Sequence, residues 1–179
     1  MRVVAGSAGG RPLVSPEGTT TRPTSDRVRE SIFNILFSLG ATEGASVCDL
    51  YAGSGALGIE ALSRGAASCI FVERDRDAVE VIHENLDTLG FTNQATVIQA
   101  DVLSWIEPQN SSTPAFDLVL ADPPYAEEEW VTLLDQLDAT FLVAESSNRI
   151  EPHPRWDVLR DKKYGATLVS VLTPKEASQ

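Results

Sequence analysis

From residue 46 onward, the chain alternates between short continuous apolar runs and stretches in which apolar residues recur every three or four positions. The first pattern is typical of strands buried on both faces of a sheet, and the second of amphipathic helices. The expected strands are 46–51, 68–73, 95–100, 116–122, 140–145, 157–159 and 166–172. The expected helices between them are 56–64, 75–89, 102–106 and 127–137.

Strands that alternate with helices in this order predict a doubly wound, Rossmann-like α/β sheet of seven strands. No helical pattern separates the last two strands, so we expect them to close the sheet as an antiparallel pair.

The first 37 residues have a different pattern. Two short extended pieces flank a turn rich in Gly, Ser and Ala at 6–10, which predicts a small hairpin. Val28, Ile32, Ile35 and Leu39 then mark one face of a helix, for which Thr24, Ser25 or Asp26 can provide the cap. We therefore expect an N-terminal extension over 1–37 and a main domain over 38–179.

The composition fits one soluble domain. The chain has 179 residues, of which 42% are hydrophobic, enough for a single core. It contains no apolar stretch near the roughly 18 residues that span a bilayer, and no long apolar N-terminal run, so we expect a cytoplasmic protein. Cys48 and Cys69 lie within predicted strands and are expected to be reduced core thiols.

Charge is distributed unevenly along the chain. The net charge of −12 argues against a nonspecific nucleic-acid coat. However, residues 1–37 and 149–179 each carry a net charge of +2, and the middle carries −16. Both ends could therefore contact a polyanion even though the whole protein is acidic.

An acid and a glycine-rich turn follow the first strand of the main domain. Asp49 precedes Gly53, Gly55 and Gly58, which have the spacing of a nucleotide-binding turn at the carboxyl end of a strand. A carboxylate beside a pyrophosphate would be repulsive, so Asp49 favours a ligand with a positive group over a dinucleotide. A packed turn that binds no ligand is the simpler alternative.

The next two strands also end in acids. Glu73 follows the glycine turn by about twenty residues, where a carboxylate can bind both ribose hydroxyls. Asp101, with Val102, ends the third strand and could accept a hydrogen bond from the adenine amine. Each acid alone could simply cap the following helix. Together with the glycine turn, they favour a nucleoside site.

The fourth strand ends in Asp122-Pro123-Pro124-Tyr125. The prolines remove two backbone donors and stiffen the turn, so the Asp122 carboxylate and the Pro123 carbonyl can be held as acceptors beside the Tyr125 ring. This arrangement could clamp a planar group that carries an amine. A strand end followed by a surface tyrosine is the alternative.

Together these motifs resemble those of class I S-adenosylmethionine-dependent N-methyltransferases. Residues 9–13, 22–30, 33–34 and 51–65 also resemble the RsmD family, and the Arg-Pro-Thr-x-Asp-Arg-Val-Arg-Glu block at 22–30 is the more specific part. The family methylates N2 of guanine 966 in bacterial 16S ribosomal RNA, in standard rRNA numbering. The resemblance therefore implies S-adenosylmethionine as cofactor, S-adenosylhomocysteine as product, and an rRNA substrate within the assembled small subunit.

The resemblance also implies roles for individual residues. Asp49 and the glycine turn would hold the methionine part of the cofactor, Glu73 its ribose, and Asp101 with Val102 its adenine. Asp122 and Pro123 would orient the guanine amine while Tyr125 stacks on the base. The positive residues expected to contact RNA phosphates are Arg11, Arg22, Arg27, Arg29, Lys162 and Lys163. No metal is expected, since His83 and His153 lie in surface contexts, and we expect a monomer.

Three other functions use part of the same pattern. A DNA adenine-N6 methyltransferase also uses Asp-Pro-Pro-Tyr, but this chain has little room for a target-recognition domain. A Rossmann oxidoreductase would explain the glycine turn and Glu73 but neither Asp49 nor Asp122. A noncatalytic RNA-binding module would need none of the acids.

Overall fold

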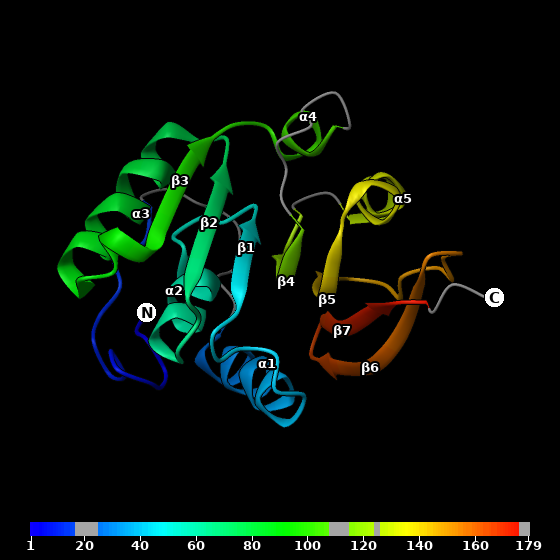
Figure 1. Ribbon diagram of the computed structural model, residues 1–179, viewed down its shortest axis with the longest axis horizontal. Coiled ribbons are helices and arrows are strands. Elements are labelled where there is room, and N and C mark those ends of the chain that lie inside the picture. The colour runs from blue at the N-terminus through cyan, green and yellow to red at the C-terminus, as the bar shows by residue number, and fades with distance from the viewer. Residues whose placement is uncertain (17–24, 108–114, 124–125, 176–179) are drawn as a thin grey trace.

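The computed structural model describes residues 1–16, 25–107, 115–123 and 126–175. Seven strands form one sheet in the order β3-β2-β1-β4-β5-β7-β6 (Figure 1). They are β1 Ser46–Leu50, β2 Ser68–Glu73, β3 Ala95–Gln99, β4 Phe116–Ala121, β5 Ala139–Ser146, β6 Trp156–Tyr164 and β7 Thr167–Pro174. The first five are parallel, and β7 runs antiparallel between β5 and β6. The predicted doubly wound sheet with an antiparallel final pair is therefore confirmed.

The described helices are α1 Asp26–Ser38, α2 Ala56–Ser63, α3 Arg76–Leu89, the short η1 Thr92–Gln94, α4 Val102–Ile106 and α5 Ala126–Gln136. Apolar side chains of α1, α2 and α3 pack on one face of the sheet, with Phe71 and Leu120 among the buried contacts. Those of α4 and α5 pack on the other face, around Leu50 and Leu142. The sheet is thus covered on both faces, which explains its continuous apolar strands.

The largest difference from the predicted elements is at β6. The sequence pattern indicates only residues 157–159, whereas β6 extends from Trp156 to Tyr164. Its second half contains the charged run 160–163 and lies at the edge of the sheet, mostly exposed. Pairing with β7 rather than an apolar pattern holds these residues extended. A long charged edge strand also discourages pairing with other chains.

The N-terminal segment packs on the main domain. A bridge between Arg2 and Pro12 gives it the expected hairpin-like form, and Val3, Ala8 and Leu13 are buried in the same core as α1, α2 and α3. On α2, the buried Glu60 carboxylate accepts hydrogen bonds from the amides of Val4 and Ala5, at 2.7 and 3.0 Å. Residues 1–16 therefore share one core with the sheet.

Cys48 and Cys69 are both buried free thiols, as expected from their positions in β1 and β2. Burial raises the pKa of each thiol well above its usual value. They are inert core residues. Within the described parts of the chain, no helix is long and apolar enough to cross a membrane.

Candidate active site

A cavity of about 540 Å³ opens at the carboxyl ends of β1 to β4. The order of the sheet reverses between β1 and β4, and this switch point is where doubly wound sheets bind ligands. The predicted site residues that line the cavity are Asp49, Gly53, Glu73, Asp101, Val102, Asp122 and Pro123. The fold therefore brings together acids that are up to 73 residues apart in sequence.

Asp49 is the most deeply placed of these acids. Its residue is 2% exposed, and its carboxylate accepts a 2.8 Å hydrogen bond from the Gly58 amide in the first turn of α2. Burial raises the pKa of Asp49 well above its usual value, while the Gly58 hydrogen bond acts in the opposite direction. The negative charges of Glu73, Asp122 and Glu145 raise this pKa further. A buried carboxylate among other acids is costly, and a positive ligand group in the cavity would relieve that cost.

The three glycines of the turn have distinct roles. Gly53 and Gly55 adopt left-handed backbone conformations with φ of 55° and 75°, which glycine accepts without strain. Gly58 lies inside α2, where an added Cβ would come within 2.4 Å of a Phe71 ring carbon. Of the three, only Gly53 lines the cavity. Gly55 and Gly58 determine the shape of the turn without facing the ligand site.

Glu73 fixes the same turn from the end of β2. One carboxylate oxygen accepts from the Gly53 amide and the other from the Asp75 amide, both at 2.9 Å. The half-buried carboxylate thereby holds the glycine turn beside β2 while facing the cavity. Its oxygens have further lone pairs with which to accept ribose hydroxyls.

Asp101 caps α4 and also lines the cavity. Its carboxylate accepts a 3.1 Å hydrogen bond from the Ser104 amide, and the residue is exposed. Capping α4 therefore leaves lone pairs of this carboxylate available for the predicted role as a nucleoside acceptor. Val102, the first residue of α4, adds a buried apolar wall.

Asp122 stands beyond the end of β4, on the cavity wall with Pro123. The residue opens to solvent through the cavity, yet the surrounding protein partly desolvates its carboxyl and raises the pKa to about 6. The Asp122 carboxyl is therefore mostly ionised at neutral pH, where it can accept hydrogen bonds. Tyr125 lies outside the described residues.

Sequence reasoning missed the wall formed by the N-terminal segment. Met1, Ser15 and Pro16 line the cavity together with the residues at the strand ends. Nothing in the local pattern of these residues indicates a site, because only the packing of the segment on α2 and α3 brings them there.

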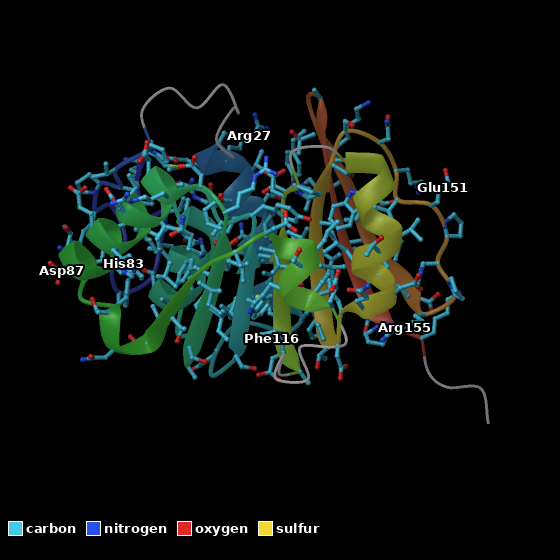
Figure 2. The ribbon with its side chains drawn as sticks, turned by 90° about the horizontal axis from the view of Figure 1, so that it is seen from above. Arg27, His83, Asp87, Phe116, Glu151 and Arg155 are labelled. Atoms are coloured by element: carbon cyan, nitrogen blue, oxygen red, sulfur yellow. The ribbon has the colours of Figure 1, made fainter. Side chains whose placement is uncertain are left out.

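Four of the positive residues expected to contact RNA are exposed. Arg27 on α1 is exposed (Figure 2), as are Lys162 and Lys163 on β6. The Lys162 ammonium lies 3.3 Å from the Ser31 hydroxyl of α1, which places Lys162 beside that helix, whereas Lys163, the next residue of the strand, points to the other face of the sheet. Arg11 is exposed, and its guanidinium donates to the Thr88 carbonyl at the end of α3. Arg22 lies outside the described residues.

Arg29 does not fit the expected role as a phosphate contact. It is fully buried, and its guanidinium donates to the Asp26 carboxylate at 2.7 Å and to the Arg2 carbonyl at 2.6 Å. This side chain instead joins α1 to the N-terminal segment.

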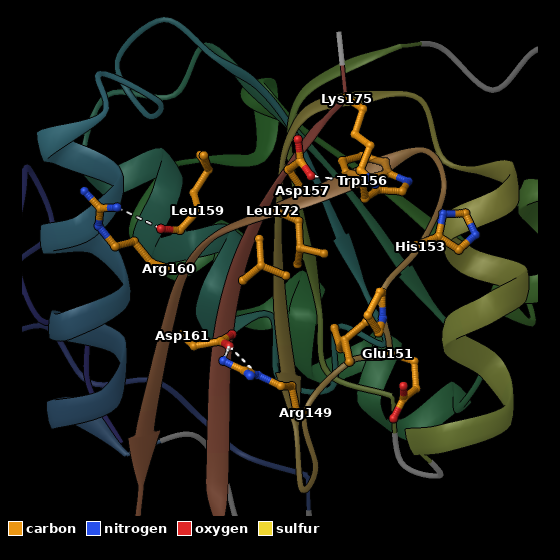
Figure 3. Close-up of a pocket in the computed structure, with 13 residues that line it drawn as sticks. Arg149, Glu151, His153, Trp156, Asp157, Leu159, Arg160, Asp161, Leu172 and Lys175 are labelled. Carbon is orange, nitrogen blue, oxygen red and sulfur yellow. Dashed lines mark hydrogen bonds and ion pairs between the residues drawn. The ribbon is translucent and has the colours of Figure 1, made fainter. Parts of the chain in front are cut away.

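A second cavity of about 400 Å³ lies beside β6, on the face of the sheet that α5 covers (Figure 3). Its cations are matched by acids, with Arg149 paired to Asp161 at 2.9 Å and Lys175 near Asp157 at 3.8 Å. It therefore offers no net charge to a ligand. His153 nearby contacts the Asp135 carboxylate, and His83 is exposed on α3 (Figure 2). Across the described ranges, no group of three potential ligands could hold a metal ion.

The sheet order, the antiparallel β7, and the acids and glycine turn around the switch-point cavity define the class I methyltransferase fold. The chain belongs to the family described as conserved hypothetical protein 95, whose model matches residues 1–173. This membership confirms the resemblance to the RsmD family.

Known relatives match over nearly the whole chain. YlbH of Bacillus subtilis is 40% identical over 181 residues, covering 96% of this chain and 97% of YlbH. Ribosomal RNA small subunit methyltransferase D of Escherichia coli K12 is 36% identical, covering 92% of this chain and 85% of that protein. The solved structure of yhhF from Escherichia coli superposes with a TM-score of 0.83 at 31% identity and covers 99% of both chains.

Proposed function

We propose that this protein transfers a methyl group from S-adenosylmethionine to the exocyclic N2 of a guanine in the 16S rRNA of the small ribosomal subunit. The observation that carries the proposal is the switch-point cavity, in which Asp122 and Pro123 meet Asp49 and Glu73. Its family relatives include proteins named as small-subunit rRNA methyltransferases. We infer a cytoplasmic, monomeric enzyme.

The polar groups that line the cavity fit this cofactor. The buried Asp49 carboxylate suits the positive amino group of the methionine part. Because Gly53 has no side chain, the ligand can approach the backbone of the turn closely. Glu73 would accept the ribose hydroxyls, and Asp101 with the Val102 backbone would bind adenine. Calorimetry can test this assignment, because binding of NAD without binding of S-adenosylmethionine would exclude it.

The reaction needs a correctly aimed amine more than a strong base. When bound, the cofactor supplies a methyl group that is already activated on a sulfonium. The Asp122 carboxylate and the Pro123 carbonyl would accept the two N–H groups of the guanine amine and draw its lone pair out of conjugation with the ring. Asp122 could then take the proton that N2 releases once its bond to the methyl carbon has formed. Tyr125 would stack on the base.

The amine of a paired guanine would not reach this cavity, so the target must be unpaired or flipped out. The exposed Arg27, Lys162 and Lys163 would contact phosphates around it, together with Arg11 and Arg22. Since the net charge is −12, these few cations would give weak binding to naked RNA. Recognition would then depend on the shape of the assembled subunit.

The direct test measures incorporation of tritiated methyl groups into naked 16S rRNA, unmethylated small subunits and duplex DNA. Digestion and mass spectrometry of the labelled nucleic acid then identify the methylated base. We expect N2-methylguanosine at a single site, formed faster on small subunits than on naked rRNA. N6-methyladenine in DNA, or label at another base, would overturn the proposed substrate.

A further inference from the structure

Asn85 lies on α3 and is 2% exposed. Its side-chain oxygen accepts from the Val14 amide at 2.8 Å, and its side-chain nitrogen donates to the Val14 carbonyl at 3.0 Å. The same nitrogen donates to the Ser54 carbonyl, also at 3.0 Å. One buried amide therefore joins the N-terminal segment to the middle of the glycine turn, two parts of the chain that are 40 residues apart.

One partner of Asn85 lines the switch-point cavity, and the other directly precedes two residues that line it. Ser54 is the lining partner, and Ser15 and Pro16, the two residues that follow Val14, also line the cavity. Asn85 itself does not line the cavity, so it would act on a ligand only through the residues that it holds.

The other anchors of the N-terminal segment lie elsewhere. Ser63 on α2 accepts from the Ala8 amide at 3.0 Å and donates to the Ala5 carbonyl at 2.6 Å. Neither Ser63 nor its two partners line the cavity. The attachment of the segment and the alignment of the cavity walls therefore depend on separable contacts.

The chemistry at position 85 requires a primary amide. Asn supplies one acceptor and two donors, and all three positions are used. An ionised Asp would place negative charge against two carbonyl oxygens. A protonated Asp has one donor and could restore at most one of those two bonds.

We propose that Asn85 is a positioning residue for the cofactor site, which sets cofactor affinity by fixing the glycine turn and the N-terminal wall in one arrangement. The inference rests on the assignment of this cavity to S-adenosylmethionine. A site with misaligned walls binds its ligand less tightly, whereas Asp122, which follows β4 rather than β1 and takes part in none of the three hydrogen bonds of Asn85, keeps its place.

The test compares Asn85→Ala and Asn85→Asp with Ser63→Ala as a matched control. For Asn85→Ala we expect the Kd and KM for S-adenosylmethionine to rise at least about tenfold, the cost of one well-made buried hydrogen bond, with kcat within about threefold of wild type. Ser63→Ala should lower the melting temperature without changing either constant by more than about twofold. For Asn85→Asp, affinity relative to wild type at the same pH should recover in part as the pH is lowered and the new carboxyl becomes protonated.

Unchanged cofactor affinity in folded Asn85→Ala would overturn the inference, as would equal losses of affinity in Asn85→Ala and Ser63→Ala. If Asn85→Ala does not fold, the pH dependence of Asn85→Asp decides, and a pH-independent affinity ratio would count against the inference. Failure of the wild-type protein to bind S-adenosylmethionine would instead contradict the proposed function. The two failures are therefore distinguishable.

Discussion

The carboxylate of Asp49 at the end of β1 and the amide of Gly58 in α2 are joined by a 2.8 Å hydrogen bond in the protein interior. Gly55, the N-cap of α2, has no side chain with which to cap the helix, so Asp49 supplies an acceptor from the neighbouring strand. The same carboxylate reaches the cavity. One residue thus connects the stability of the turn with the charge of the site.

Replacing Asp49 with Asn should separate these two roles. The amide oxygen can still accept from Gly58, so the fold is retained, while the charge offered to the cofactor amino group is lost. We expect about 10- to 100-fold weaker S-adenosylmethionine binding by calorimetry, the value of one charge-assisted hydrogen bond. Because the neutral side chain no longer buries a charge, the melting temperature at neutral pH should not fall. Wild-type affinity in this variant would rule out the assigned role.

Replacing Asp122 with Ala should abolish methyl transfer while cofactor binding persists. The variant loses the fixed acceptor for the guanine amine, and loss of one such group typically costs about 10²–10³ in kcat. Methyl incorporation into small subunits measures the first effect and calorimetry the second. Full activity in this variant would rule out the proposed clamp.

The raised pKa of Asp122 predicts a specific dependence of activity on pH. Since only the deprotonated carboxylate accepts from the amine, kcat/KM should rise as the pH increases through about 6 and then reach a plateau. A profile that is flat from pH 5 to pH 8 would show that Asp122 is not the group that titrates.

The same shift predicts how stability depends on pH. A carboxyl whose pKa is higher in the folded state than the usual 3.8 favours folding while protonated, and this contribution is lost as the pH rises through about 6. The Asp122→Asn variant has no such loss. Its melting temperature relative to wild type should therefore increase between about pH 4 and pH 7, as measured by thermal unfolding. A constant difference across this range would contradict the shift.

Arg29 and Arg27 should behave differently when each is replaced with Ala. Removing the fully buried Arg29 leaves Asp26 and the Arg2 carbonyl without that partner and opens a cavity, at a cost of about 3 kcal/mol or more in unfolding free energy. Removing the exposed Arg27 should change stability by less than about 0.5 kcal/mol but weaken binding to small subunits. Urea unfolding and a binding assay distinguish these outcomes. Equal effects of the two variants on stability would contradict this view of Arg29.

The separate contributions of sequence and tertiary structure are clearest in particular elements. The bounds of β2 and α4 agree with those expected, because the apolar run of β2 and the cap of α4 at Asp101 are local signals. The second half of β6 has no such signal, since its mostly exposed charged residues are held extended by pairing with β7 and bury no continuous apolar face. The local pattern of polar and apolar residues therefore predicts helices and strands that bury an apolar face. It misses strand residues, such as those of the second half of β6, that lack such a face and are extended through pairing with a neighbouring strand.

The same division applies to the site. The sequence by itself determined the glycine turn and the acids at the ends of the strands, because parallel strands bring their carboxyl ends to one edge of a sheet wherever the chain places them. Only the tertiary structure decided that Arg29 is buried, that residues 15–16 line the cavity and that Asn85 joins Val14 to the glycine turn. These features depend on contacts between residues tens of positions apart, which no local pattern of polar and apolar residues records.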